Sequence, residues 1–372
     1  MCLGAAGVAS MIAGCDVRSA SKRPASAAGG PGADNLSDSF ASEFGPYLTK
    51  QDVFIEVTRS RPYLLPQENL AEVGLTRDTW SLEVDSDSDH PAVVENPLTR
   101  AGGTAFDFSA LMELAKTKSV RYAKALSCLN NNRILGMGVW EGVPLRDVLW
   151  LADPKRNLRR VYYYGYHEGD PKRRFQSSLP IGRVLEDAFG LPPVILCYKL
   201  NGEWLSSKRG GPVRMIVPEC YAFKSVKWLT NVVLTNLEHA NDSYAKGNND
   251  IDTHMKSFAG FIDTPAKVEA NRPFVIKGYG QVGVSGVSKV QIWSHNTADG
   301  DVPLKGRFEN APWVDAKILS APKDWNDSFS SGNARGIGFD QKTRMPLQWP
   351  MEFTKLHWIY EHPGMKPGTH LI

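Results

Sequence analysis

The chain has 372 residues, of which 42% are hydrophobic and 22% charged, so it is long and apolar enough for a large core and two domains. Lysine and arginine exceed aspartate and glutamate by only 43 to 40, and this small net charge gives no indication of a nucleic-acid partner. The five cysteines do not form the pattern of a disulfide framework, and no apolar run approaches the roughly 18 to 20 residues that span a bilayer.

Residues 1–44 have the composition of an export leader followed by a tether. The first 14 residues are small and apolar, like the later part of a secretory signal, although no basic stretch precedes them, so we expect the true start to lie upstream. Residues 12–15 resemble a bacterial lipoprotein cleavage site, which would make Cys15 a lipid anchor; the alternative is a chance run of small residues. Residues 19–39, rich in Ser, Ala, Gly and Pro, predict a flexible tether.

Residues 45–245 mix short strands and short helices without a regular alternation, which predicts an α+β domain. The strands are expected from alternating or β-branched runs and the helices from apolar residues at helical spacing. The predicted strands are 52–58, 80–84, 161–164, 194–200, 213–217 and 232–235, and the predicted helices are 108–116, 143–151 and 181–189.

Beyond this domain, a polar segment at 246–270 reads as a linker, and helical patterns disappear after it. Residues 271–372 predict a β-sandwich, because short strand candidates are separated by Gly, Asn, Asp and Pro. The last residues resemble a turn entering a strand that is not completed, so we expect this sandwich to be truncated. Its strand candidates are 274–279, 288–293, 313–319 and 353–360.

Cys128 is a candidate ligand or nucleophile. It is predicted to lie in a loop between the helices 108–116 and 143–151, with Arg133 near enough to stabilise a thiolate and with small or amide neighbours. The alternative is a buried, inert thiol. A second candidate feature follows at 211–229, where a strand carries Arg214 and a loop offers lysines and backbone N–H groups that together could bind a phosphate. The alternative there is a solvated basic loop.

These segments, in this order, resemble the sulfite oxidase family of molybdenum enzymes. The resemblance covers most of the chain, and its last part is similar to the immunoglobulin-like dimerisation domain of that family. The matching segments are Cys128 with Asn131 and Arg133, Trp140 to Leu149, Tyr198 to Gly202, Pro212 to Pro218, Lys224 to Leu229, Ile276 to Tyr279 and Val284 to Gly286.

The resemblance implies a molybdenum ion held by a molybdopterin and by the thiolate of Cys128, a soft sulfur ligand that suits a redox-active metal. His167 stands where relatives commonly carry an acid, so it is either a cofactor contact or a surface imidazole. The implied cofactor-binding residues are Gly165, His167, Arg209, Arg214, Lys224, Ser225, Val226 and Lys227.

The resemblance also implies two catalytic residues. Tyr198 matches a tyrosine beside the metal that could bind the substrate or relay a proton, and the alternative is a tyrosine packed in the core. Arg133 matches an arginine that attracts an oxyanion, unless it only pairs with the thiolate or a carboxylate. The Arg-Asn-His loop of sulfite-oxidising relatives is missing at 62–70, which puts sulfite itself in doubt.

The sequence therefore predicts an exported, periplasmic molybdopterin oxidoreductase. It would transfer an oxygen atom to or from a sulfur oxyanion or sulfoxide and exchange electrons with an external carrier such as a cytochrome c, since the chain shows no second redox centre. A homodimer is implied by the resemblance alone. The alternative is a non-catalytic binding or scaffold protein that keeps the fold. A zinc site is not predicted, because no group of His and Cys residues has the required spacing.

Overall fold

The computed structural model describes residues 42–58, 61–130, 133–170, 172, 174–188, 190–243, 252, 254–300, 311–323, 325–329 and 334–372. The predicted leader and Cys15 lie outside these described residues. The chain forms two compact units of mixed helix and sheet, with sheet in the majority. We call 46–255 with 322–348 the first unit, and 256–321 with 349–372 and the described part of 1–45 the second unit.

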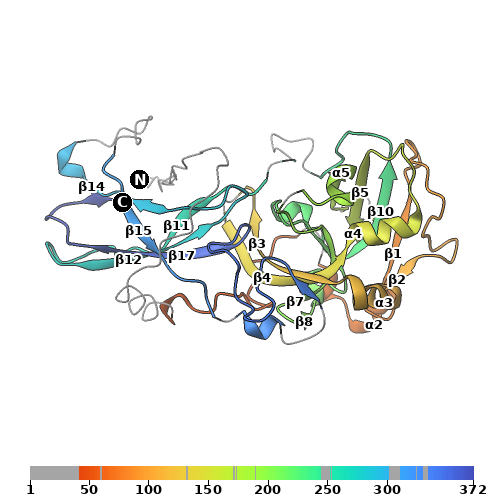
Figure 1. The fold of residues 1–372 in the computed structure, drawn as a ribbon, viewed down its shortest axis with the longest axis horizontal. Helices are drawn as coiled ribbons and strands as arrows, with labels where there is room; N and C mark the ends of the chain where they lie inside the picture. The colour runs from red at the N-terminus through yellow and green to blue at the C-terminus, as the bar shows by residue number, and fades with distance from the viewer. Residues whose placement is uncertain are drawn as a thin grey trace, which may run out of the picture. The chain divides into compact units, whose positions relative to one another are not determined.

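The first unit contains a five-stranded sheet in the order β2-β1-β10-β5-β6, in which β1 and β10 run parallel. Figure 1 labels four of these strands, β1, β2, β5 and β10. The predicted alternation in β1 is confirmed, because Leu82 and Val84 are buried while their neighbours are more exposed. The strands are β1 (Ser81–Ser86), β2 (Phe106–Asp107), β5 (Arg160–Gly165), β6 (Gln176–Pro180) and β10 (Leu229–Thr235).

A second sheet of the same unit has the order β16-β3-β4-β7-β8, and β9 pairs with β7. Its central hairpin corrects the prediction that Cys128 lies in a loop between two helices, since Cys128 is the last residue of β3. The hairpin was missed because both strands are buried along nearly their whole length and so do not alternate. The strands are β3 (Val120–Cys128), β4 (Arg133–Pro144), β7 (Ile195–Leu200), β8 (Glu203–Trp204), β9 (Arg214–Ile216) and β16 (Arg335–Gly336).

Helices in the first unit are few and short. The longest, α3 (Phe108–Lys118), starts at Asp107, whose side chain accepts a hydrogen bond from the N–H of Ala110, the expected N-cap arrangement. The predicted helix 143–151 starts later, because β4 runs through Pro144, and the predicted strand 52–58 has no strand structure. The remaining helices of this unit are η2 (Pro62–Leu64), α2 (Gln67–Glu72), α4 (Leu145–Leu149), η3 (Trp150–Ala152), α5 (Ile181–Leu185), η4 (Ser207–Arg209), η5 (Ala222–Lys224) and η8 (Asn326–Phe329). The second unit contains η1 (Ser42–Phe44) and η6 (Thr297–Asp299).

Strand β7 separates two hydrophobic cores of the first unit. Leu196 and Tyr198 belong to the larger core, which also contains Leu82, whereas Ile195 and Cys197 belong to the smaller core. This division follows from the strand period of two, which sends successive side chains to opposite faces. The smaller core is the one against which Cys128 packs.

The second unit is built around a five-stranded antiparallel sheet in the order β11-β12-β17-β15-β13. Four of its strands confirm the strand predictions after residue 271, while β11 falls in the segment predicted as a linker. A further pair, β14 with β18, forms a separate two-stranded ladder. The strands are β11 (Phe258–Asp263), β12 (Phe274–Gln281), β13 (Val290–Ile292), β14 (His295–Asn296), β15 (Val314–Ile318), β17 (Lys355–His362) and β18 (His370–Leu371).

Residues 322–348 return from the second unit to complete the first, so the compact units do not follow the single block 271–372 that the sequence suggests. The returning segment adds β16 in parallel to the edge of β3 and places Trp325 in a fully buried position. Arg121 of β3 donates a hydrogen bond to the carbonyl of Ser328 at 3.1 Å. No helix among the residues that the structure describes has the length and apolarity needed to cross a bilayer.

Candidate functional site

A cavity of about 330 Å³ lies in the first unit where the end of β3, the end of β5 and the loops on either side of β9 meet. Its size is in the usual range for a small-molecule site. We call it the Cys128 cavity. Seven of the residues predicted for the site line it, namely Cys128, Gly165, Arg209, Arg214, Ser225, Val226 and Lys227.

Cys128 has the exposure that a ligand or nucleophile needs. It is a free, partly buried cysteine that lines the cavity from the end of β3. Cys197 and Cys220 are free but buried, and burial raises the pKa of each thiol to about 12, so both are protonated at neutral pH. Among the described cysteines, Cys128 alone combines access to the cavity with a position outside the core.

Two buried arginines and a lysine give the cavity its charge. Arg209 and Arg214 are 2% and 3% exposed, and neither forms an ion pair within the described part of the chain. Arg214 donates to the carbonyl of Arg209 at 2.7 Å and to that of Ser225, yet its Nε, like Nε and Nη2 of Arg209, is buried without a partner. Buried donors of this kind are costly unless they are paired, and both arginines line the cavity, so an anion bound there would lower this cost.

Lys227 shares this environment. Burial, and then the charges of Arg214 and Arg209, lower the pKa of Lys227 to about 7. Burial likewise lowers the pKa of Arg214 to about 10. A bound anion would reverse this repulsion, because each of the three cations would gain a counter-charge.

Gly165, the last residue of β5, allows the Lys227 backbone to approach the sheet. A Cβ at position 165 would lie 2.0 Å from the carbonyl oxygen of Lys227, a distance that real Cβ atoms do not show. Gly210, with φ +99°, makes a similar close approach to the Lys227 side chain. The two glycines thus seat Lys227 against the cavity.

We expect Gly165→Ala to destabilise the chain by about 1–3 kcal/mol, because the new methyl group would force the Lys227 backbone away from β5. Gly182→Ala is the matched control, since nothing lies within 4 Å of a Cβ built there, and it should be neutral or slightly stabilising. Thermal or denaturant unfolding of both variants measures the difference. Equal midpoints would show that the loop adapts without cost.

Lys224 does not reach the cavity, which corrects its prediction as a cofactor-binding residue. Its ammonium is buried, 2.7 Å from the carboxylate of Asp242 and 2.8 Å from the carbonyl of Ser178. The short helix η5 ends at Lys224, and the side chain turns inward rather than towards the space that Ser225 and Lys227 face. The solvated-loop alternative is also wrong, because the side chain is 1% exposed.

His167 lines a neighbouring cavity rather than the Cys128 cavity. The two cavities share Gly165 and Tyr166. The imidazole stacks on Tyr164 with ring centroids 6.0 Å apart, and its Nδ1 is buried without a partner. The sequence placed His167 in the correct loop, but the chain turns away from the cavity after Tyr166.

Tyr198 lies on the opposite face of β7 from the cavity. Its hydroxyl donates to Glu141 at 3.2 Å, its ring lies against Trp204, and burial, followed by the charge of Glu141, raises its pKa. The predicted position beside Cys128 is therefore wrong and the alternative of a packed tyrosine holds. The reason is the strand period, since Cys197 takes the face that Cys128 packs against.

Arg133 pairs with Cys128 across the β3–β4 hairpin, but its side chain is exposed and does not line the cavity. Asn131, part of the same predicted motif, lies outside the described residues. The cavity also has apolar walls that no sequence pattern indicated, because they come from segments far apart in the chain. These wall residues include Phe54, Leu126, Leu135, Phe175 and Trp228.

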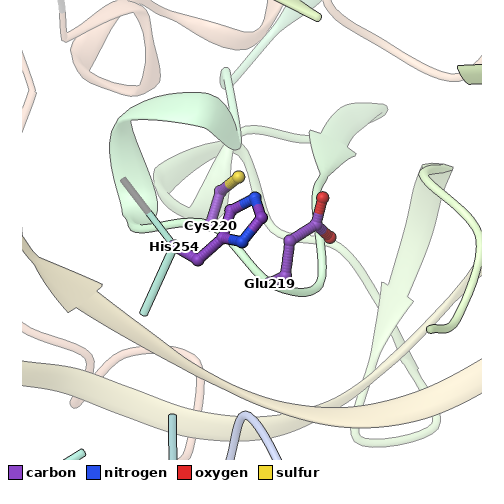
Figure 2. A group of neighbouring side chains, drawn as sticks. All are labelled: Glu219, Cys220 and His254. Carbon is purple, nitrogen blue, oxygen red and sulfur yellow. The ribbon is translucent and has the colours of Figure 1, made fainter. Parts of the chain in front are cut away.

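A second cluster of possible ligands lies elsewhere in the first unit. The ligand atoms of Glu219, Cys220 and His254 all lie within 4.8 Å of one another (Figure 2), although their spacing in the sequence gave no sign of it. Arg183, however, already binds the carboxylate of Glu219 through bonds of 2.7 and 3.0 Å, and the ammonium of Lys124 donates to the Cys220 carbonyl at 2.7 Å. Two fixed cations thus oppose a metal ion here, and we assign the cluster to ion pairing.

Residues 71–244 match the family model described as the oxidoreductase molybdopterin binding domain. The NADH nitrate reductase of Volvox carteri is 27% identical over 224 residues, which are 47% of this chain and 26% of that protein. The NADH nitrate reductase of Spinacia oleracea is 34% identical over 120 residues, 32% of this chain and 13% of that protein. The chain therefore matches about a quarter or less of the length of these relatives.

Among solved structures, the sulfane dehydrogenase SoxCD from Paracoccus pantotrophus is similar with a TM-score of 0.50. The match has 18% sequence identity and covers 77% of this chain and 64% of that one. At this identity the likeness concerns the fold.

Proposed function

Because residues 71–244 form a molybdopterin-binding domain of the sulfite oxidase type, we propose that the chain is a molybdenum-dependent oxidoreductase that transfers an oxygen atom to or from a small sulfur compound. The observation that carries the proposal is the Cys128 cavity. There the free thiol of Cys128 and the unpaired cations of Arg209, Arg214 and Lys227 face one space. A soft metal ligand and an anion site are the two features that a metal-bearing pterin phosphate requires.

Within this proposal each group has a physical role. The thiolate of Cys128 would hold the metal. Arg209 would offer its free Nε and Nη2 donors to the phosphate, and Arg214 its free Nε. Lys227 would add a third charge, and the apolar walls would exclude water and strengthen these interactions. When bound, the cofactor would supply the two-electron oxygen chemistry.

The choice of a sulfur substrate rests on the resemblance to the sulfite oxidase family. Nitrate is a second candidate, because curated relatives at 27% and 34% identity are nitrate reductases. Sulfite and nitrate are both small oxyanions that a positively charged approach would attract, whereas a sulfoxide is neutral. Electrons would pass to or from an external carrier such as a cytochrome c.

The test begins with purified chain from a host that makes molybdopterin. We expect close to one molybdenum and one pterin per chain, measured by elemental analysis and by fluorescence of the oxidised pterin. Assays with sulfite, methionine sulfoxide and nitrate, using artificial electron carriers, then decide between the substrates. A metal content well below one per chain would contradict an enzymatic role.

Arg133 remains a prediction as the residue that attracts an anionic substrate. Its exposed guanidinium, at the position paired with Cys128, can act on an anion arriving from solvent. We expect Arg133→Gln to raise KM for an anionic substrate by about 3- to 10-fold with little change in kcat, because a steering charge acts before the chemical step. The exposed Arg156→Gln is the control, and a fall in kcat alone would assign Arg133 a different role.

We also propose that the second unit is an immunoglobulin-like dimerisation domain and that the protein is exported to the periplasm. Support for the first point is its antiparallel five-stranded sheet, and support for the second is the composition of residues 1–44. Light scattering of the purified protein measures the oligomeric state. Cell fractionation with lipid labelling tests export and the anchor at Cys15.

A further inference from the structure

We propose that Asp242 is a positioning residue for the Cys128 cavity. Its buried carboxylate holds Lys224 and so fixes the turn 225–227, from which Ser225 and Lys227 face the cavity. The inference rests on the proposed function for its meaning, because the turn would carry the groups that bind the pterin phosphate.

The anchor is fully enclosed. The side chains of Asp242 and Lys224 are 0% and 1% exposed, and their oxygen and nitrogen atoms lie 2.7 Å apart. Ser178 donates to the other carboxylate oxygen at 2.6 Å, and Ser177 donates to the same oxygen as Lys224. Asp242 thus accepts three charge-assisted or hydroxyl hydrogen bonds in a region without solvent.

Lys224 passes this constraint directly to the turn, because it is the residue before Ser225. Its carbonyl accepts a hydrogen bond from the hydroxyl of Tyr163 at 2.8 Å, and the carbonyl of Val226 accepts from the backbone N–H of Met215 at 2.9 Å. The ammonium is therefore fixed from one side while the backbone is fixed from the other. Lys224 is thus held at both its side chain and its backbone, directly before Ser225.

Asp242 is itself held by a segment that follows β10 and lies along β5 and β6. Gln176 donates to the carbonyl of Asn241 at 2.6 Å, and Tyr162 donates to that of His239 at 2.7 Å. The backbone N–H of Ser243 donates to the carbonyl of Gln176 at 3.0 Å. The anchor is thus part of the sheet framework rather than of a free loop.

The pairing also has an electrostatic consequence. Because Asp242 neutralises Lys224, the net charge that faces the cavity comes from Arg209, Arg214 and Lys227. Without the carboxylate of Asp242, the ammonium of Lys224 would be buried and unpaired. Its movement towards other acceptors would displace the turn 225–227.

The test uses three variants of the full chain, made in a host that supplies molybdopterin. They are Asp242→Asn, the neutral pair Lys224→Met with Asp242→Asn, and Asp153→Asn as a surface control, since the ion pair of Asp153 with Lys155 is exposed. We expect Asp242→Asn to release pterin about tenfold faster than the wild type. The neutral pair should melt close to the wild type, because no charge is left unpaired, but should still release pterin faster.

Hydrogen exchange of the cofactor-free protein provides a readout that does not depend on bound pterin. Both anchor variants should speed amide exchange at 225–227 while leaving the β3–β4 hairpin unchanged. The proposal would be overturned if the double variant Lys224→Met with Asp242→Asn kept its pterin and its slow exchange. Asp242 would then serve only to neutralise the buried charge of Lys224, and not to position the turn. Wild-type chain without pterin would instead contradict the proposed function, and the exchange result would still decide the role of Asp242.

Discussion

Replacing Cys128 by serine is expected to abolish turnover and molybdenum retention while the chain stays folded. Serine removes the soft thiolate that would hold the metal, and the hard hydroxyl is a poor substitute. The position is partly exposed at the end of β3, so the free energy of unfolding should change by no more than about 1 kcal/mol. Activity, metal content and thermal unfolding of the purified variant measure the three quantities.

Cys197→Ser is the matched control for this experiment. Cys197 is buried in the smaller core and does not line the cavity. We expect it to lose about 1–3 kcal/mol of stability through burial of a hydroxyl, and to keep its metal. Retained activity in Cys128→Ser would eliminate the assignment of the metal ligand.

The stability of the cofactor-free protein is expected to rise with pH between about 7 and 10. Folding lowers the pKa of Lys227 from 10.5 to about 7, so in this range the unfolded chain binds more protons than the folded chain. The free energy of unfolding therefore increases with pH, with a slope of up to about 1.4 kcal/mol per pH unit for one group. The cost of burying the charged ammonium of Lys227 is fully present below pH 7, and it disappears as the pH approaches the pKa of lysine in the unfolded chain.

Lys227→Met should remove most of this rise and stabilise the cofactor-free chain at pH 6 by an amount on the order of 3 kcal/mol. Added pyrophosphate should flatten the wild-type profile, because a bound anion restores the charged form of Lys227. Lys124, whose pKa burial lowers to about 8, accounts for the slope that remains. Denaturant unfolding at several pH values measures both effects, and an unchanged slope in Lys227→Met would contradict the assignment. The exposed Lys172→Met serves as the control.

The sequence predicted the parts of the site that lie close together in the chain. Arg209, Arg214, Ser225 and Lys227 come from one strand and the loops beside it, so a linear pattern was sufficient to bring them together. Cys128 was found as well, although its strand was not. Buried strands such as β3 do not alternate, and without alternation a strand gives no periodic signal.

The errors have a common physical origin, which is that the direction of a side chain depends on partners elsewhere in the sequence. Lys224 turns inward because Asp242, far along the chain, offers a buried carboxylate. Tyr198 faces away from the cavity because Cys197 occupies the other face of β7. Nothing within either local sequence distinguishes these orientations from the predicted ones.

The return of residues 322–348 to the first unit has a consequence for synthesis of the chain. A ribosome must deliver almost the entire polypeptide before the edge of β3 acquires β16, and until then that edge is open to other strands. A fragment cut after residue 245 would keep this exposed edge permanently and would also lack the buried indole of Trp325. We therefore expect the first unit to fold poorly as a fragment that ends at residue 245, and the nascent chain to expose the edge of β3 until its last part is made.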